Sequence, residues 1–317
     1  MIGTDINKAA ELLTAGEIVA IPTETVYGLA ANAFNDVAVT KVFEAKKRPS
    51  FDPLIVHTDS FEKVKHFTTH VPDAAQKLAE AVWPGPLTLI LPKKHIIPDI
   101  VTSGNNTVGV RIPNHPLTLE LLSQLNFPLA APSANPFGYI SPTTAQHVAD
   151  QLGDKIPYIL DGGACQVGIE STIVSFAYDV PRILRLGGLK IEQITDIIGE
   201  VEMQLTENSN PQAPGQLDTH YAPSVKLILI DNLTKELEKI ENVKEVGIIS
   251  LSSYFAEVPS DNQIRLSPEE DINEAARNLF AAMRSLDSLK LKIILAEKMP
   301  EMGLGAAIND RLKRASV

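Results

Sequence analysis

Short apolar runs alternate with amphipathic segments of helical length through the first 200 residues of this 317-residue chain. Strands separated by helices of that length favour a layered α/β sheet. Strands are predicted at 17–22, 53–57, 87–92, 107–113, 128–134, 170–176 and 182–187. Helices are predicted at 8–16, 36–46, 72–82, 116–125 and 143–151. We therefore predict an α/β domain over residues 1–200.

The alternation stops at residue 201 and resumes after residue 223. Residues 201–223 are polar, rich in Pro, Asn and Gln, and without a sustained apolar period, which is typical of a linker. Beyond it, strands are predicted at 225–230, 245–251 and 291–297, and helices at 269–288 and 305–316. These elements predict a second, smaller α/β domain over residues 224–317.

Composition narrows the class of protein. Hydrophobic residues make up 44% and charged residues 21%, which is typical of a globular chain. The N-terminus lacks the features of a signal peptide, and no apolar run approaches the roughly 18 residues of a membrane span. The single cysteine, Cys165, excludes an internal disulfide and any multi-cysteine zinc site. A cytoplasmic protein without a membrane partner is expected.

Negative charge is spread over the whole chain. The formal net charge is −11, and residues 1–200 carry 15 basic against 21 acidic side chains. Tight binding to a nucleic-acid backbone needs clustered Lys and Arg side chains, so direct RNA binding is disfavoured. A small anionic ligand in a local basic pocket remains compatible with this balance.

The first candidate substrate-binding residues are hydroxyl side chains and cations. In PTETVYGL (22–29), Thr23, Thr25 and Tyr27 follow a predicted strand and can orient a polar substrate, although a Thr-capped turn explains them equally well. In KKRP (46–49), three consecutive cations at a helix end suit phosphate oxygens, or simply the helix dipole. His57, at the end of the next strand, is either a structural residue or a ligand contact.

Two arginines lie inside predicted apolar strands. Arg111 in TVGVRIP and Arg185 in RILRLGG would each cost several kcal/mol if left unpaired, so Arg111 should face an internal carboxylate or an anionic ligand. An amino-acid carboxylate would fit the fork of its guanidinium. Arg185 should likewise face a carboxylate or an anionic ligand.

Two further loops carry small and polar residues. In APSANPFGYISPTT (131–144), Ser133, Asn135 and Ser141 could line a nucleotide, or form only a Pro-rich turn. In DGGACQVGIESTIV (161–174), Ser171 begins a strand, and Cys165 is interpreted as a buried thiol rather than a nucleophile. With no recognised nucleophile or metal motif, such a site suits nucleotidyl transfer, where positioning and charge stabilisation dominate.

Taken in order, PTETVYGL, KKRP–PLIVH, TVGVRIP, APSANPFG–SPT, DGG–VGIESTIV and RLG closely resemble the YrdC-type domain of threonylcarbamoyl-AMP synthases. The resemblance covers residues 5–197. The remainder resembles the C-terminal domain of the long form of that family, reached through a linker that ends in HYAP (220–223). The resemblance implies a YrdC-like twisted open sheet with helices, followed by a linker and a smaller Rossmann-like α/β domain. The linker would act as a lid over the active site.

The resemblance also implies the reaction. Threonine and bicarbonate or CO2 would form a carbamate, which attacks the α-phosphorus of ATP. Pyrophosphate would leave, and threonylcarbamoyl-AMP would pass to a separate tRNA threonylcarbamoyl transferase. This chain would therefore interact with tRNA at most indirectly. Magnesium is expected with ATP, with no protein ligand predicted for it.

Site residues follow from the same resemblance. Thr25, His57, Arg111 and Ser171 are implied to bind L-threonine. Residues implied to surround ATP are Lys46, Arg48, Asp52, Thr107, Ser133, Asn135, Ser141, Arg185 and Tyr221. Lys46 and Arg48 are expected to be catalytic, because they would neutralise the charge that builds up as pyrophosphate leaves.

Two positions depart from the family pattern. Lys47 stands where glycine is common, and Asp52 belongs to a segment that often ends in asparagine. An acid facing the phosphates should repel them unless magnesium or Lys47 compensates. The alternative function is a YrdC-like paralogue that binds nucleotide or RNA and acts on another substrate.

Overall fold

The computed structural model describes residues 1–207 and 211–316, which form two compact units. The first unit comprises residues 1–137, 142–166 and 170–218, and the second comprises 138–141, 167–169 and 219–317. Residues 208–210 of the predicted linker lie outside the described residues. The predicted domain boundaries at 200 and 223 therefore remain a prediction.

The first unit is built on a mixed sheet, in which the described strands follow the order β1-β8-β2-β3-β7-β4-β6-β5-β9-β10-β11. Its strands are β1 (Ile2–Gly3), β2 (Val19–Ile21), β3 (Gly28–Asn32), β4 (Ile55–His57), β5 (Leu87–Pro92), β6 (Thr107–Arg111), β7 (Leu129–Ala130), β8 (Tyr158–Leu160), β9 (Thr172–Ser175), β10 (Arg182–Arg185) and β11 (Glu202–Met203). Central strands are apolar because the sheet is buried on both faces; every residue of β2 and β4 is buried.

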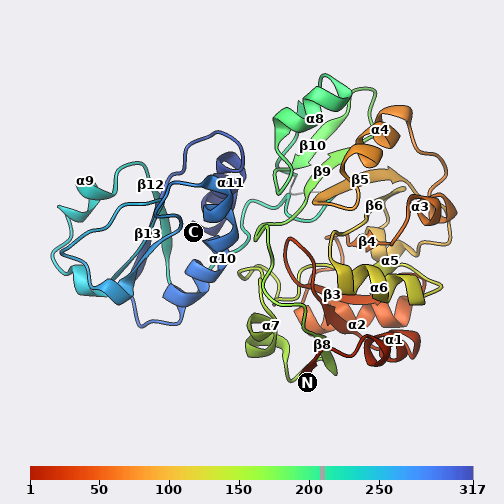
Figure 1. Cartoon of the computed structure of the whole chain (residues 1–317), viewed down its shortest axis with the longest axis horizontal. Helices are drawn as coiled ribbons and strands as arrows, with labels where there is room; N and C mark the ends of the chain where they lie inside the picture. The colour runs from red at the N-terminus through yellow and green to blue at the C-terminus, as the bar shows by residue number, and fades with distance from the viewer. Residues whose placement is uncertain (208–210, 317) are drawn as a thin grey trace. The chain divides into compact units, whose positions relative to one another are not determined.

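Helices connect and cover these strands. They are α1 (Ile6–Thr14), α2 (Asp36–Lys46), α3 (Phe61–Phe67), α4 (Asp73–Val82), α5 (Asp99–Thr102), α6 (Pro116–Gln124), α7 (Ala145–Leu152) and α8 (Ile191–Ile198). Helix α1 packs against α6, and α4 packs against α8 (Figure 1). Side chains fix where several of them begin: the Asn35 carboxamide oxygen accepts from the backbone N–H groups of Val37 and Ala38 at the start of α2.

The second unit contains a smaller sheet, whose described strands pair in parallel in the order β12-β15-β13-β14. The strands are β12 (Leu227–Ile230), β13 (Val246–Ser250), β14 (Gln263–Arg265) and β15 (Ile293–Glu297), and the helices are α9 (Leu233–Leu237), α10 (Ile272–Asp287) and α11 (Gly305–Ala315). Helix α10 is amphipathic and buries residues from Ala275 to Leu286 along one face. Parallel strands alternating with helices confirm the predicted Rossmann-like α/β arrangement.

Two short chain segments from the middle of the sequence belong to this second unit. In the 138–141 segment, Arg284 of α10 donates to the backbone oxygens of Ile140 and Ser141. In the 167–169 segment, Gly168 has φ +80°, and a Cβ there would lie 2.3 Å from the Cα of Arg277. Only glycine fits that close approach to α10.

The α/β fold class is confirmed, and several elements were not predicted. Strand β3 occupies residues that the sequence analysis placed partly in a loop, and β8 and α8 were missed. The predicted strand 128–134 is ordered as a strand only over β7. None of the helices in residues 1–207 and 211–316 is long and apolar enough to cross a membrane.

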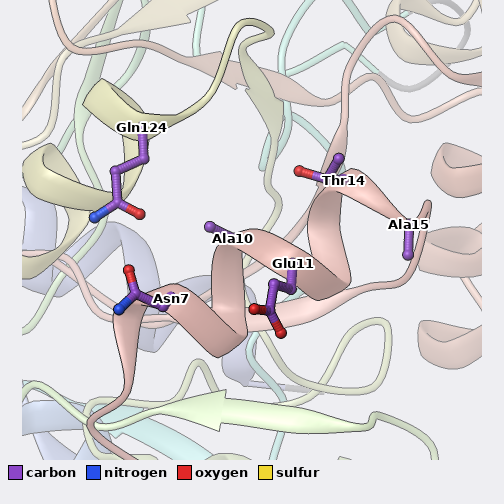
Figure 2. Close-up of a pocket in the computed structure, with 6 residues that line it drawn as sticks. All are labelled: Asn7, Ala10, Glu11, Thr14, Ala15 and Gln124. Carbon is purple, nitrogen blue, oxygen red and sulfur yellow. The ribbon is translucent and has the colours of Figure 1, made fainter.

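A surface hollow lies between α1 and the last residue of α6 (Figure 2). Its lining residues are Asn7, Ala10, Glu11, Thr14, Ala15 and Gln124. None of the residues predicted to bind substrate is among them, so the hollow is separate from the candidate site.

Candidate active site

Two polar side chains lie in register at the carboxyl ends of neighbouring parallel strands. Strand β4 ends at His57 and β6 ends at Arg111, and the two residues are partners in the ladder. Burial lowers the pKa of His57 to about 3, with a smaller contribution from the charge of Arg111. His57 is therefore a neutral hydrogen-bonding group at physiological pH, and Arg111 is the cation at this edge.

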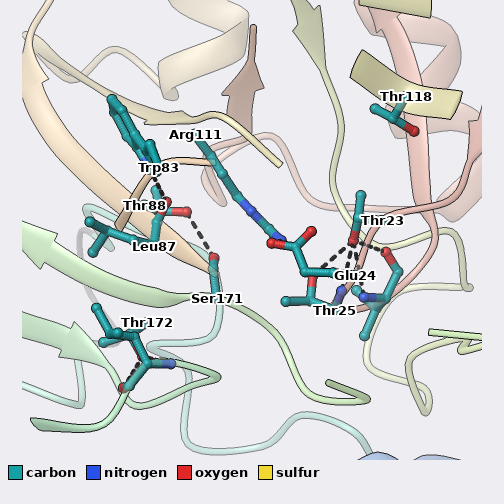
Figure 3. A network of polar contacts seen from close by, with 12 residues as sticks. Thr23, Glu24, Thr25, Trp83, Leu87, Thr88, Arg111, Thr118, Ser171 and Thr172 are labelled. Atoms are coloured by element: carbon teal, nitrogen blue, oxygen red, sulfur yellow. Dashed lines mark hydrogen bonds and ion pairs between the residues drawn. The ribbon is translucent and has the colours of Figure 1, made fainter. Parts of the chain in front are cut away.

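The partner of Arg111 is Glu24, in the turn between β2 and β3 (Figure 3). The Nη2 atom of Arg111 lies 2.8 Å from Oε1 of Glu24, and the two side chains are only 4% and 5% exposed. Of the two partners that the sequence allowed for this arginine, the structure thus contains an internal carboxylate. Removing one member of such a buried pair typically costs about 3–5 kcal/mol.

The turn that carries Glu24 is held by its own hydroxyl groups. Thr23 Oγ1 accepts from the backbone N–H groups of Thr25 and Val26 at 3.1 and 3.2 Å, and donates to the Val26 oxygen at 2.7 Å. The Thr23 and Thr25 hydroxyls also lie 2.9 Å apart. The turn-capping interpretation is confirmed for Thr23, Thr25 lies beside Glu24 (Figure 3), and a role for these hydroxyls in orienting a substrate stays a prediction.

Ser171 joins a second group of polar side chains. Its Oγ lies 2.8 Å from the Thr88 hydroxyl (Figure 3). The same atom accepts from Nη2 of Arg185 at 3.1 Å. Nε of Arg185 also donates to the Ser171 backbone oxygen at 3.1 Å. Gly187 permits this arrangement, because a Cβ there would lie 2.2 Å from the backbone oxygen of Glu170.

Lys46 ends helix α2 and is 1% exposed. Its Nζ donates to the backbone oxygens of Ser133 and Asn135, both at 2.5 Å. Burial lowers the pKa of Lys46 well below its usual range, and the nearby charge of Arg48 acts in the same direction. The partners of Nζ are neutral carbonyls, so the approach of an anion would raise the pKa of Lys46 again and favour the charged ammonium form.

Arg48 pairs with Asp52 four residues later. Nη2 of Arg48 lies 2.8 Å from Oδ2 of Asp52, while Nε and Nη2 also donate to the backbone oxygens of Asp52 and Pro53. Burial raises the pKa of Asp52, and the charges of Arg48, Lys46 and Arg185 oppose that effect. The cation that compensates Asp52 is thus Arg48, whereas Lys47 or magnesium is the expectation from the sequence.

Lys47 itself explains one departure from the family pattern. It is exposed, and it ends α2 with φ 53°, in the left-handed region that favours glycine. A glycine would adopt this backbone conformation without strain, and the Lys47 side chain lies outside the buried group of Lys46, Arg48 and Asp52.

Arg185 connects the two groups of side chains. It hydrogen-bonds Ser171, and its charge opposes the burial that raises the pKa of Asp52 beside Arg48. Its Nη1 further donates to the backbone oxygen of Pro214, 3.3 Å away, in the segment predicted as a linker. Ala213 packs into the apolar cluster of Ile55, Ile90, Ile173 and Leu184, so this segment lies against the sheet of the first unit at Ala213.

The other predicted residues fall in several places. Thr107 begins β6, about 13 Å from Arg111 at the usual rise per residue, so the two cannot share one small ligand group. Ser133 and Asn135 contact Lys46 through their backbone oxygens. Ser141 is buried in the second unit.

Tyr221 also belongs to the second unit. Its ring stacks on Phe280 with centroids 5.5 Å apart, and Arg311 lies over it at 5.1 Å. Its φ is 64°, which is uncommon for a non-glycine residue. The contact with ATP predicted for Tyr221 remains a prediction.

Glu24 and Thr88 are the members of this site that the sequence analysis missed. A buried Arg111 needs an anionic partner, and this need was the only sign of Glu24 in the sequence. Several other acidic residues could have been that partner. Thr88 is a lone hydroxyl residue in the apolar strand LTLILP, which was a weaker signal.

The arrangement offers cations and hydroxyls rather than a nucleophile. Cys165 is buried, and burial raises the pKa of its thiol to about 12, which agrees with the interpretation as an unreactive side chain. Among residues 1–207 and 211–316 there is no group of three or more His, Cys, Asp or Glu side chains that could hold a metal ion. The site is suited to binding and stabilising anions.

Two family models together match nearly the whole chain. The Sua5/YciO/YrdC model, described as telomere recombination, matches residues 11–187. A second model, described as the C-terminal domain of threonylcarbamoyl-AMP synthase, matches residues 189–317.

Full-length relatives agree with these matches. A protein of Pyrococcus abyssi named threonylcarbamoyl-AMP synthase is 42% identical over 98% of this chain and 94% of its own length. A Bacillus subtilis protein of the same name is 40% identical over 98% of this chain and 92% of its own length.

Solved structures resemble the chain to different extents. The crystal structure of P. abyssi Sua5 complexed with L-threonine has a TM-score of 0.91 and 42% identity, and covers 98% of this chain and 94% of that one. Full-length HypF in its phosphate- and nucleotide-bound form has a TM-score of 0.53 and 26% identity, over 58% of this chain and 29% of that one.

Proposed function

The chain belongs to the family of threonylcarbamoyl-AMP synthases, and we propose that it makes threonylcarbamoyl-AMP from L-threonine, bicarbonate or CO2, and ATP, releasing pyrophosphate. The observation that carries the proposal is the position of Arg185. The Arg185 side chain hydrogen-bonds Ser171, which lies beside the Thr88 hydroxyl, and its charge also acts on Asp52, the partner of Arg48. An amino-acid subsite and a nucleotide subsite would thus meet at one residue, as transfer between the two substrates requires.

The threonine subsite is proposed around Arg111. Its guanidinium would take the α-carboxylate, while Thr25, Ser171 and the neutral His57 would orient the amine and hydroxyl. These side chains are buried, and Thr25 and Ser171 are fully so. Exclusion of water also suits a carbamate and a mixed anhydride, both of which water destroys.

The ATP subsite is proposed around Lys46 and Arg48. As the carbamate oxygen attacks the α-phosphorus, the bond to the leaving pyrophosphate breaks and negative charge moves onto it. Lys46 and Arg48 would stabilise that charge. Asp52, Thr107, Ser133, Asn135, Ser141, Arg185 and Tyr221 are proposed to complete the nucleotide contacts.

Magnesium is proposed to enter with ATP. Mg2+ commonly binds substrate phosphates and water with only one or two carboxylates, so it needs no cluster of acidic ligands. When bound, the ion would supply further charge neutralisation at the phosphates.

The function is tested by pyrophosphate release from ATP by the purified full-length chain. Release is expected only when L-threonine and bicarbonate are both present, with threonylcarbamoyl-AMP detected by mass spectrometry. ATP binding without such release would favour the paralogue with another substrate. We further propose a cytoplasmic location and transfer of the product to a separate tRNA-modifying transferase.

Asp52→Asn is expected to tighten ATP binding about threefold to tenfold, because it removes a negative charge beside the phosphates. The two backbone oxygens that accept from Arg48 would remain and would keep the guanidinium in place. The dissociation constant for ATP can be measured by calorimetry. Glu44→Gln is the control, because it removes an exposed acid from α2, the helix that precedes Asp52. Weaker binding would show that Asp52 instead orients Arg48.

A further inference from the structure

The ion pair between Glu24 and Arg111 is close but incomplete. Both carboxylate oxygens of Glu24, and Nε and Nη2 of Arg111, make no hydrogen bond within the described part of the chain, although the two groups approach to 2.8 Å. Buried polar atoms are almost always hydrogen-bonded, because an unpaired one typically costs about 1–3 kcal/mol. The pair therefore has acceptors and donors to spare for a ligand.

These spare atoms are complementary to an amino-acid zwitterion. Arg111 offers donors for an α-carboxylate, and Glu24 offers acceptors for an α-ammonium group. The turn held by Thr23 fixes Glu24, and the ladder between β4 and β6 fixes Arg111, so both charges are positioned before the ligand arrives. A ligand with one charge would leave one of the two groups without a partner.

We propose that Glu24 binds the α-ammonium group of threonine and accepts the proton that this group must lose before carbamoylation. The N–H bond breaks, and its electron pair becomes the nitrogen lone pair, which attacks the carbon of CO2. A C–N bond forms as one C=O π bond opens onto oxygen, and a second proton leaves the nitrogen for water. The proposal rests on the proposed function and makes carbamate formation a step of this site.

Few other titratable groups face Glu24. Arg111 approaches from β6, His115 from the start of α6, and Cys165 from the loop after β8. Burial lowers the pKa of His115 and raises that of Cys165 to about 12. At neutral pH both are uncharged, so the charge on Glu24 is balanced by Arg111.

The test is Glu24→Gln, which keeps the size of the side chain but removes its charge and its basicity. At about pH 7 the rate of threonine- and CO2-dependent pyrophosphate release is expected to fall about a hundredfold, since a positioned base typically contributes at least that much. The variant should regain about tenfold in rate per pH unit as free amine replaces ammonium, so its deficit narrows toward about pH 9.

Two controls accompany this variant. Glu17→Gln removes a carboxylate with the same 2.8 Å approach to a cation, Lys41, at a more exposed position, and it should match the parent at every pH. Glu24→Asp keeps a carboxylate and should recover part of the rate at neutral pH. Thermal unfolding identifies any variant that has lost its fold.

A parent-like rate for a folded Glu24→Gln variant would overturn the proposal. So would a deficit that stays constant from about pH 6.5 to about pH 9.5, because a purely structural role has no reason to depend on the amine. Failure of the parent chain to release pyrophosphate would instead contradict the proposed function, which keeps the two failures distinct.

Discussion

Lys46→Met is expected to lower the turnover number of pyrophosphate release about a thousandfold, with a smaller change in the KM for ATP. A preorganised buried donor typically contributes about two to three orders of magnitude to kcat, and a full charge on transferring phosphate can contribute more. Lys46 uses two of its three donors on the backbone oxygens of Ser133 and Asn135, so one donor remains for a phosphate oxygen. Steady-state kinetics at saturating ATP measure the effect.

Lys47→Met is the matched control for this prediction. It removes the adjacent lysine, which is exposed, and keeps a non-glycine residue in the left-handed conformation at the end of α2. It should leave turnover unchanged. Equal losses in both variants would contradict the role given to Lys46, and near-normal turnover of Arg48→Ala at saturating ATP would contradict the parallel role given to Arg48.

Arg111→Lys is expected to raise the KM for L-threonine about a hundredfold while affecting ATP binding little. Lysine keeps the positive charge opposite Glu24 but loses the planar fork that holds a carboxylate through two hydrogen bonds. The expected change corresponds to about 2.7 kcal/mol, at 1.36 kcal/mol for each tenfold. Threonine titrations of pyrophosphate release, together with calorimetry for ATP, separate the two substrates.

The control for this variant is Arg182→Lys. Arg182 also has a carboxylate partner at 2.8 Å, Glu202, but in a partly exposed pair at the end of the same sheet. Its substitution should leave the KM for threonine unchanged. A normal threonine KM for Arg111→Lys would contradict the assignment of the α-carboxylate to Arg111.

Long periodic elements could be predicted from the sequence, and short ones could not. Helix α2 and strand β5 occupy the predicted residues 36–46 and 87–92, because each is long enough for its apolar pattern to be recognised. Strand β8 has three residues, too few for any period. Strand β3, GLAAN, consists of small residues that resemble a turn, and its pairing with β2 and β7 makes it a strand.

Site residues could be predicted where a charged side chain stands in an apolar segment or in a cluster of like charges. Arg111 in an apolar strand and the cations at 46–48 stood out for that reason, and the structure buries Arg111, Lys46 and Arg48. Which carboxylate meets Arg111 depends on how β3 folds back beside β2, which no local pattern specifies. Asp52 was expected to be compensated by magnesium or Lys47, whereas the turn that follows α2 places it against Arg48.

The two compact units are not two consecutive stretches of sequence. The chain passes from one unit to the other at residues 137/138, 141/142, 166/167, 169/170 and 218/219. A gene fragment that stops at residue 200 would therefore encode the segments 138–141 and 167–169 without α10, on which Ile140 and Gly168 rest. Any exchange of one unit for another would therefore have to replace those two segments together with α10.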